Sequence, residues 1–143
     1  MKFKPFLLIC TLSLSGLTHA QTQVSVGTGY QHGSVLGAQI AFQNDANRYY
    51  IAAGAVGFAA GYEHAIGSPK QHTLGFALGK EEITSEDGFA VATYNYYFNG
   101  MANPGWKLGI SLGSRREDTA SFFGDSGDST TKTAISIDVA YNF

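Results

Sequence analysis

Bulky apolar residues alternate with small or polar ones, with a period of two, along eight short segments of this chain. In the last thirteen residues, TKTAISIDVAYNF, every second position from Ile135 to the final Phe143 is bulky and apolar. Such alternation predicts β-strands with one bulky face and one small, polar face. The segments are 24–30, 36–42, 49–54, 58–63, 74–79, 90–98, 106–113 and 135–143.

The stretch 49–66 allows two interpretations, one long strand or two strands joined near Val56-Gly57. An up-and-down barrel with both termini at one end needs an even number of strands, which favours two. We therefore expect an all-β fold, an eight-stranded antiparallel up-and-down barrel.

The connections between these strands fall into two groups. Residues 44–47, 67–70 and 99–105 are rich in Gly, Asn and Pro and predict turns at one end of the barrel. At the other end we expect connections at 31–34, 56–57, 80–88 and 114–131, of which the last is the longest.

The face opposite the bulky residues carries Gly, Ala, Ser, Gln and Asn but few charges. Charged residues are 14% of the chain, against about 25% in a typical soluble domain. A soluble barrel buries its bulky face and exposes a charged one. We weigh this alternative below a transmembrane barrel, in which the bulky face meets lipid and the polar face fills a narrow interior.

The first twenty residues have the features of a secretory signal peptide. Lys2 and Lys4 precede an apolar run from Phe6 to Leu17, and Ala20 is the small residue at the expected cleavage point. The run is too short and too interrupted for a membrane anchor. We expect a signal peptide at 1–20 and a barrel domain at 21–143.

Cleavage would change both the cysteine content and the charge. The single cysteine, Cys10, lies in the signal segment, and Ile9 before it does not fit a lipoprotein site. Loss of Lys2 and Lys4 leaves seven basic against eleven acidic residues, a net charge of −4. Without a basic stretch, nucleic acid is not an expected partner.

Aromatic residues gather on the bulky face near the turn end of the predicted strands. Amphipathic rings at such positions are typical of the girdle at a membrane–water interface. The predicted girdle consists of Phe42, Tyr49, Tyr96, Phe98, Trp106 and Tyr141.

A final Phe143, preceded by Tyr141 and Val139 at alternate positions, resembles the closing signal of bacterial outer-membrane barrels. Together with the signal segment and eight strands, this resemblance covers residues 21–143 and points to the small OmpA/OmpX-type, porin-like family. It implies a location in the Gram-negative outer membrane and recognition of the last strand by the barrel assembly machinery. The two tight connections at 31–34 and 56–57 depart from the long outer loops of that family.

Inward parity places four charged residues in or near the interior of the barrel: Glu63, Lys107, Arg115 and Asp138. Lys107 and Asp138 are expected to meet across neighbouring strands. Buried charges must pair or stay hydrated. The set predicts a structural salt-bridge network or, alternatively, the lining of a narrow ion path.

Two further kinds of chemistry have weaker support. A surface enzyme acting on lipid A would need a Ser-His-acid set, for which only His32, Ser34 and a carboxylate from Glu81, Glu82 or Glu86 are available. The acidic stretch with Asp118, Asp125 and Asp128 lacks the spacing of a calcium loop and is more typical of a solvated turn.

These observations favour a small outer-membrane barrel with a structural or surface-interaction role. A narrow porin-like channel is the alternative, and a lipid A-modifying enzyme is a third interpretation. We expect no enzyme activity, cofactor or metal, and a monomer that contacts lipid. A surface partner at 114–131, where Phe122 and Phe123 lie, is also expected.

Overall fold

A computed structural model describes residues 20–82, 85–118 and 129–143 of the chain. The predicted signal segment before Ala20 lies outside these residues, as do Phe122, Phe123, Asp125 and Asp128. The described strands are β1 (Gln21–Gly29), β2 (Ser34–Asn44), β3 (Asn47–Gly54), β4 (Gly57–Ile66), β5 (His72–Glu81), β6 (Ser85–Tyr97), β7 (Gly105–Asp118) and β8 (Ser129–Asn142).

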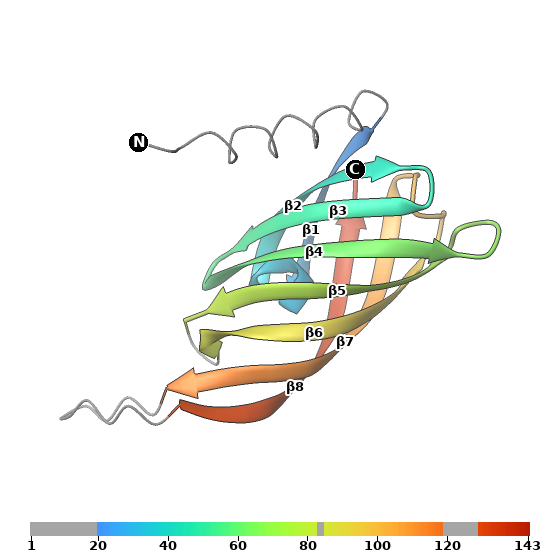
Figure 1. Cartoon of the computed structure of the whole chain (residues 1–143). Coiled ribbons are helices and arrows are strands. Elements are labelled where there is room, and N and C mark those ends of the chain that lie inside the picture. The colour runs from blue at the N-terminus through green and yellow to red at the C-terminus, as the bar shows by residue number, and fades with distance from the viewer. Residues whose placement is uncertain (1–19, 83–84, 119–128) are drawn as a thin grey trace, which may run out of the picture.

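The eight strands form one closed barrel in which each strand pairs antiparallel with the next and β8 pairs with β1 (Figure 1). The predicted all-β fold and strand number are confirmed. β3 and β4 are separate strands joined through Ala55 and Val56, so the two-strand interpretation of 49–66 is correct. No helix in the described residues has the length and apolar character to cross a bilayer.

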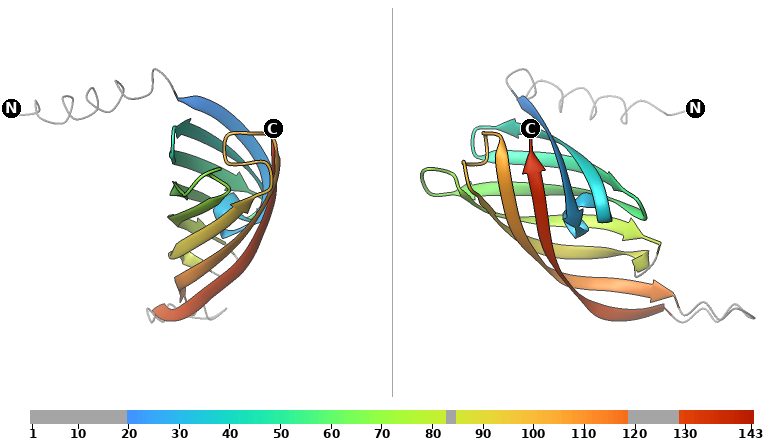
Figure 2. Two further views of the ribbon diagram at one scale, coloured as in Figure 1. Left: turned by 90° about the vertical axis from the view of Figure 1, so that its right-hand side faces the viewer. Right: turned by 180° about the vertical axis from the view of Figure 1, so that it is seen from behind.

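The barrel has two distinct ends. The connections β2–β3, β4–β5 and β6–β7 lie at one end, which we call the turn end, together with Gln21 and Phe143 (Figure 2). The other connections form the loop end. The chain therefore passes up and down the barrel in the predicted order.

The strands at the loop end are longer than the sequence pattern suggested. The expected connection 80–88 is wrong at both ends, since β5 continues to Glu81 and β6 begins at Ser85. The expected loop 114–131 is likewise shortened, because β7 and β8 stay paired as far as Asp118 and Ser129. A cross-strand ion pair stabilises this extension, because Glu117 of β7 lies 2.5 Å from Lys132 Nζ of β8. Glu117 also lies 2.8 Å from the guanidinium of Arg115 on its own strand.

The β1–β2 connection differs most from expectation. Instead of a tight outer connection at 31–34, the chain forms a 3₁₀ turn, η1 (Tyr30–His32), whose three residues are all buried. Gly29, with φ of 94°, turns the chain inward at this point. A side chain there would also meet the Asp138 carboxylate. This connection therefore enters the barrel and fills part of its interior.

The two faces of the sheet are sharply different. Residues facing outward include Ile51, Phe58, Leu78, Ile110 and Ile137, all more than half exposed, and each strand carries at least one exposed large apolar or aromatic side chain. Inward positions alternate between large polar residues and small ones. At Gly61, for example, a Cβ would lie only 2.3 Å from the Tyr50 ring, so glycine lets that ring cross the interior.

Candidate functional site

Four charged side chains lie in the interior of the barrel with no exposed surface: Arg48, Glu63, Lys107 and Asp138. They come from β3, β4, β7 and β8 respectively. Their formal charges sum to zero, with two cations and two carboxylates. Neutrality matters here because an uncompensated charge in an enclosed interior is strongly destabilising.

Lys107 and Glu63 form the central ion pair, with 3.6 Å between Nζ and Oε1. The other carboxylate oxygen of Glu63 accepts hydrogen bonds from the Tyr97 hydroxyl at 2.5 Å and from Thr73 Oγ1 at 3.2 Å. Lys107 also donates to Gln31 Oε1 at 3.2 Å. Residues from four strands and η1 thus share one buried network.

Arg48 holds the turn-end half of the interior together. Its guanidinium donates to Gln23 Oε1 at 3.0 Å, to Gln39 Oε1 at 2.9 Å and to Asn142 Oδ1 at 3.3 Å. It also lies 5.5 Å from the centre of the Tyr97 ring, within cation–π range. This single side chain connects β3 with β1, β2 and β8.

Sequence reasoning did not include Arg48 among the interior charges. The sequence pattern could have identified Arg48, because it lies two residues before Tyr50 on the same strand and therefore faces the same side, the interior. The predicted strand began at Tyr49, two residues too late, because β3 starts at Asn47.

Asp138 and Lys107 do not form the direct pair that their neighbouring strands suggested. Asp138 instead accepts hydrogen bonds from the Gln31 backbone N–H at 3.1 Å and from the hydroxyls of Ser111 at 2.6 Å and Ser136 at 3.1 Å. Gln31 bridges the two residues, since its backbone binds Asp138 and its side chain accepts from Lys107. The inward fold of η1 is therefore the physical reason for the difference.

Arg115 lies apart from this network, towards the loop end. It donates to the Tyr30 hydroxyl at 3.3 Å, and its guanidinium is 2.8 Å from Glu117. About a quarter of its side chain is exposed. Of the predicted interior set, Glu63 and Lys107 are brought together, Asp138 joins them through Gln31, and Arg115 does not.

The two residues His32 and Ser34, which the enzyme interpretation needs side by side, make their hydrogen bonds to different partners. Ser34 donates to the Glu81 carboxylate, but His32 is fully buried and its Nε2 lies 3.1 Å from Ser25 Oγ. In the described part of the chain, His32 and Ser34 do not hydrogen-bond to each other, and the side chain of Glu86 lies outside that part. The serine, histidine and carboxylate of the third interpretation therefore do not form a chain of hydrogen bonds among the described residues.

The predicted girdle residues lie on the outer face near the turn end and touch one another in pairs. Tyr96 and Phe98 have ring centres 5.1 Å apart, and Trp106 and Tyr141 have theirs 5.3 Å apart. Tyr49 contacts Tyr62, which sequence reasoning missed. Phe42 lies opposite Tyr49 in the register of β2 and β3.

The last strand ends on the same aromatic group. Phe143 is exposed, its ring centre lies 5.1 Å from that of Tyr141, and its backbone N–H donates to Val24 O at 2.9 Å. Val139, two residues before Tyr141 on β8, also faces outward. These three residues of the predicted closing signal thus form one outward row beside β1.

Outside the interior, Asp45 and Lys70 form an ion pair between two turns at the turn end. The hydrogen bond from Lys70 lowers the pKa of the Asp45 carboxyl below its usual value. In the described residues, no group of three or more His, Cys, Asp or Glu side chains is arranged to hold a metal ion.

We predict that removing one charge of the central pair destabilises the barrel more than removing both. Lys107→Met or Glu63→Gln leaves the interior with a net charge and should lower the free energy of unfolding by about 3 kcal/mol. The double variant restores neutrality and should therefore lose less stability than either single variant. Urea titration of the refolded chain in detergent micelles measures all three.

Lys132→Met provides the matched control, because that lysine pairs with Glu117 at an exposed position. Its loss should cost less than about 1 kcal/mol. Equal losses for Lys132→Met and Lys107→Met would contradict a stabilising role for interior neutrality.

Comparison with known proteins gives no relative for this chain: no protein-family model, curated protein or solved structure matches it. The geometry and chemistry of the described residues are therefore the basis for the proposal that follows.

Proposed function

We propose that this chain is a small barrel of the Gram-negative outer membrane, with a filled interior and a structural or surface-interaction role. The observation that carries this proposal is the reversed distribution of side chains. The exposed face is apolar around the whole circumference, whereas the enclosed face holds four charged residues that are fully buried.

The apolar face is too extensive for a barrel surrounded by water. Exposed Val, Ile, Leu or Phe side chains occur on β1 to β5, β7 and β8, and β6 contributes exposed Tyr94. Soluble monomers rarely expose continuous apolar patches larger than a few hundred Å². A closed barrel with this surface satisfies its backbone internally, which is the requirement for crossing a bilayer.

The two ends of the barrel fit the two sides of such a membrane. The aromatic girdle at the turn end suits a membrane–water interface. Short turns at that end suit the periplasm, and the projecting β7–β8 hairpin suits the outer surface. The signal segment at 1–20 and the closing residues Val139, Tyr141 and Phe143 support export and insertion by the assembly machinery.

The packed interior supports the structural role over the alternative of an open channel. Gln31, Lys107, Asn95 and Tyr97 all reach into the interior and are fully buried. Gln31 connects η1 to β6 and β7 through hydrogen bonds of 2.9 Å to Asn95 and 3.3 Å to Ser111. Side chains therefore occupy the width of the barrel near its middle.

A surface partner remains part of the proposal. It would bind at the loop end, where β7 and β8 extend past the neighbouring strands (Figure 1). Since 119–128 lies outside the described residues, the proposal rests on the extended hairpin. We further propose that the barrel acts as a monomer.

Trp106, the only tryptophan of the chain, tests membrane placement directly. It is 57% exposed and lies in the girdle at the turn end. In vesicles, lipids brominated near the headgroup should quench its fluorescence more than lipids brominated near the chain ends. The control combines Trp106→Phe with Ile110→Trp, which moves the probe towards mid-strand and should reverse the order of quenching. Absence of quenching in both proteins would refute membrane placement.

Conductance distinguishes the filled barrel from the channel. We expect the refolded chain to give no steady current steps in a planar bilayer, provided that its unboiled gel band shifts on heating. Steps whose size changes in Lys107→Met and Asp138→Asn would instead support a narrow channel lined by those charges.

Deletion of Phe143 tests the closing signal. We expect much less heat-modifiable barrel in the outer membrane of cells producing the truncated chain, because the terminal aromatic is part of the proposed assembly signal. Phe98→Ala removes another exposed girdle ring and should leave assembly near the level of the unchanged chain. Normal assembly without Phe143 would contradict this function of the last residue.

A further inference from the structure

The last strand, β8, has a backbone edge that stays open beyond the point where β1 ends. β1 pairs with β8 only through Ser25 to Gly27, opposite Asn142 to Ala140. On its other side, β8 remains paired with β7 as far as Ser129. Among the described residues, no strand pairs with the β1 side of β8 between residues 129 and 137, a stretch that we call the open edge.

The backbone groups on the open edge can be assigned from the strand itself. The Phe143 N–H donates to Val24 O of β1. In an antiparallel sheet every second residue directs its N–H and C=O to the same neighbouring strand, and β8 runs beside β7 without a shift in register. Thr131, Thr133 and Ile135 therefore direct their backbone donors and acceptors to the side where β1 has ended.

The inward turn η1 contacts β8 but does not close this edge. The Tyr30 N–H donates to Ser136 Oγ at 3.4 Å, and the Gln31 N–H donates to Asp138 Oδ1 at 3.1 Å. Both acceptors are side-chain atoms. These two hydrogen bonds therefore leave the backbone groups of the open edge without a partner strand in the described part of the chain.

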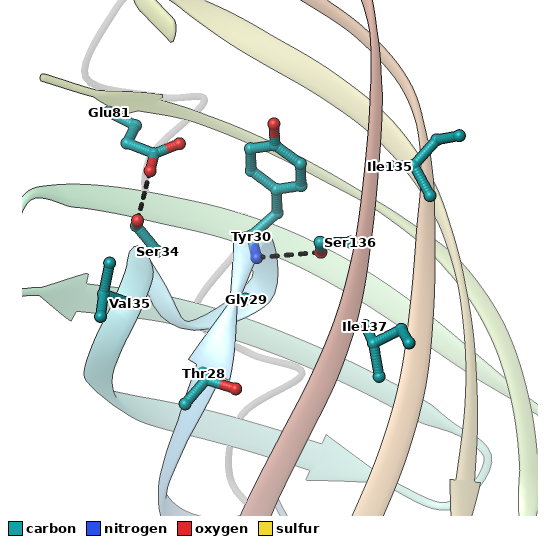
Figure 3. A pocket seen from close by; sticks show the side chains of 9 residues that line it. All are labelled: Thr28, Gly29, Tyr30, Ser34, Val35, Glu81, Ile135, Ser136 and Ile137. Atoms are coloured by element: carbon teal, nitrogen blue, oxygen red, sulfur yellow. Dashed lines mark hydrogen bonds between the residues drawn. The ribbon is translucent and has the colours of Figure 1, made fainter. Parts of the chain in front are cut away.

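The outward side chains of β8 become more exposed where β1 stops. Val139 is 39% exposed, whereas Ile137 and Ile135 are 68% and 66% exposed. Figure 3 shows these two isoleucines across an opening from Val35 of β2, with Tyr30 between them. The rise in exposure marks the level at which β8 loses its neighbour.

The sequence of the open edge favours strand pairing. Natural edge strands are often protected by Pro, by several charges or by a bulge. The stretch STTKTAISI contains neither Pro nor Gly, and Thr and Ile are good strand formers. Its single charged residue, Lys132, pairs with Glu117 of β7. The open edge is therefore a template for an added strand.

An extended polypeptide is the ligand that matches a row of alternating backbone donors and acceptors. Acyl chains offer no hydrogen bonds to such a row. A second copy in the same membrane also fits poorly. Two upright barrels run their β8 strands in the same direction, and strands tilted by about 35–45° in opposite senses cross instead of aligning. A strand from a different protein can run antiparallel to β8, as β1 does.

Charge adds a preference for one kind of partner strand. The described end of the β7–β8 hairpin carries three basic residues, Arg115, Arg116 and Lys132, and two acidic ones, Glu117 and Asp118. A residue directly opposite Lys132 in an added strand would share its face of the sheet. Opposite charges at such positions attract, and like charges repel. An acidic residue is therefore favoured there.

We propose that the open edge binds an extended segment of a partner protein as an added antiparallel strand, with an acidic residue opposite Lys132. This inference deepens the surface-interaction role proposed above and rests on it. The outward residues of the added strand continue the apolar or β-branched face formed by Thr133 and Ile135.

The probe is the synthetic peptide Val-Thr-Val-Glu-Val-Thr-Val, labelled for fluorescence anisotropy and titrated with the refolded mature chain in detergent micelles. In the proposed pairing its valine N–H groups face β8. N-methylation of the valines should weaken binding at least about tenfold, because it removes those donors. N-methylation of the other three residues, whose N–H groups face away, should leave binding near its original strength.

Hydrogen exchange locates the bound strand on the barrel. In the free chain, the amides of Thr131 and Thr133 should exchange much faster than those of Lys132 and Ala134, which face β7. The peptide should slow exchange at Thr131 and Thr133 at least about tenfold. It should leave the rates at the other two amides nearly unchanged.

Two pairs of changes test the edge and the charge. Thr133→Pro removes an edge donor that β7 does not use and should abolish binding, whereas Thr133→Val keeps that donor and should not. A peptide with Lys in place of Glu should bind the unchanged chain about threefold more weakly. Lys132→Met should remove that preference. Heat-shifted gel bands show that each variant is folded.

Each contrary outcome overturns the proposal. Slow exchange at Thr131 and Thr133 in the free chain would mean that the edge is not open, and protection that grows with barrel concentration would assign the edge to a second copy. Equal binding of the two methylated peptides, or no binding of any peptide, would exclude strand addition. Quenching of Trp106 without peptide binding would leave membrane placement intact, so the two failures are distinguishable.

Discussion

Closure of the sheet between β1 and β8 is the constraint on which the rest of the structure depends. It rests on three residue pairs, Ser25 to Gly27 with Ala140 to Asn142, and on the hydrogen bond from the Phe143 N–H to Val24 O. A closed sheet has no free edge along this stretch and creates an enclosed interior. Both the buried charge network and the apolar exterior presuppose that ring.

Closure of the sheet creates an enclosed space that side chains must fill. An eight-stranded barrel has an interior just wide enough for side chains to fill, and in this chain those side chains are polar. Arg48, Glu63, Lys107 and Asp138 balance in charge, and the inward fold of η1 supplies Gln31 as a shared hydrogen-bond partner. A connection between two strands thus completes the interior that the strands alone leave incomplete.

Period-two alternation, together with the even number of strands that an up-and-down barrel with both termini at one end needs, was sufficient to predict the strand number and the antiparallel barrel. It was also sufficient to place Glu63, Lys107 and Asp138 inside. It did not predict that Tyr30, Gln31 and His32 turn inward, since no periodicity extends through a connection. It missed Arg48 and the extended β7–β8 hairpin because charged residues at strand ends look like loop in sequence. Whether two inward residues touch depends on what lies between them, as Gln31 shows for Lys107 and Asp138.

The position of Arg48 has a consequence for the rate at which the barrel comes apart. Its partners Gln23 and Asn142 belong to the first and last strands, which meet only when the ring is complete. The hydrogen bond to Asn142 can form only when the ring closes, whereas the bond to Gln23 joins β1 and β3 and does not require closure. Interactions that are absent from the folding transition state act mainly by slowing unfolding. The hydrogen bond from Arg48 to Asn142 is thus expected to slow unfolding of the finished barrel more than it speeds folding.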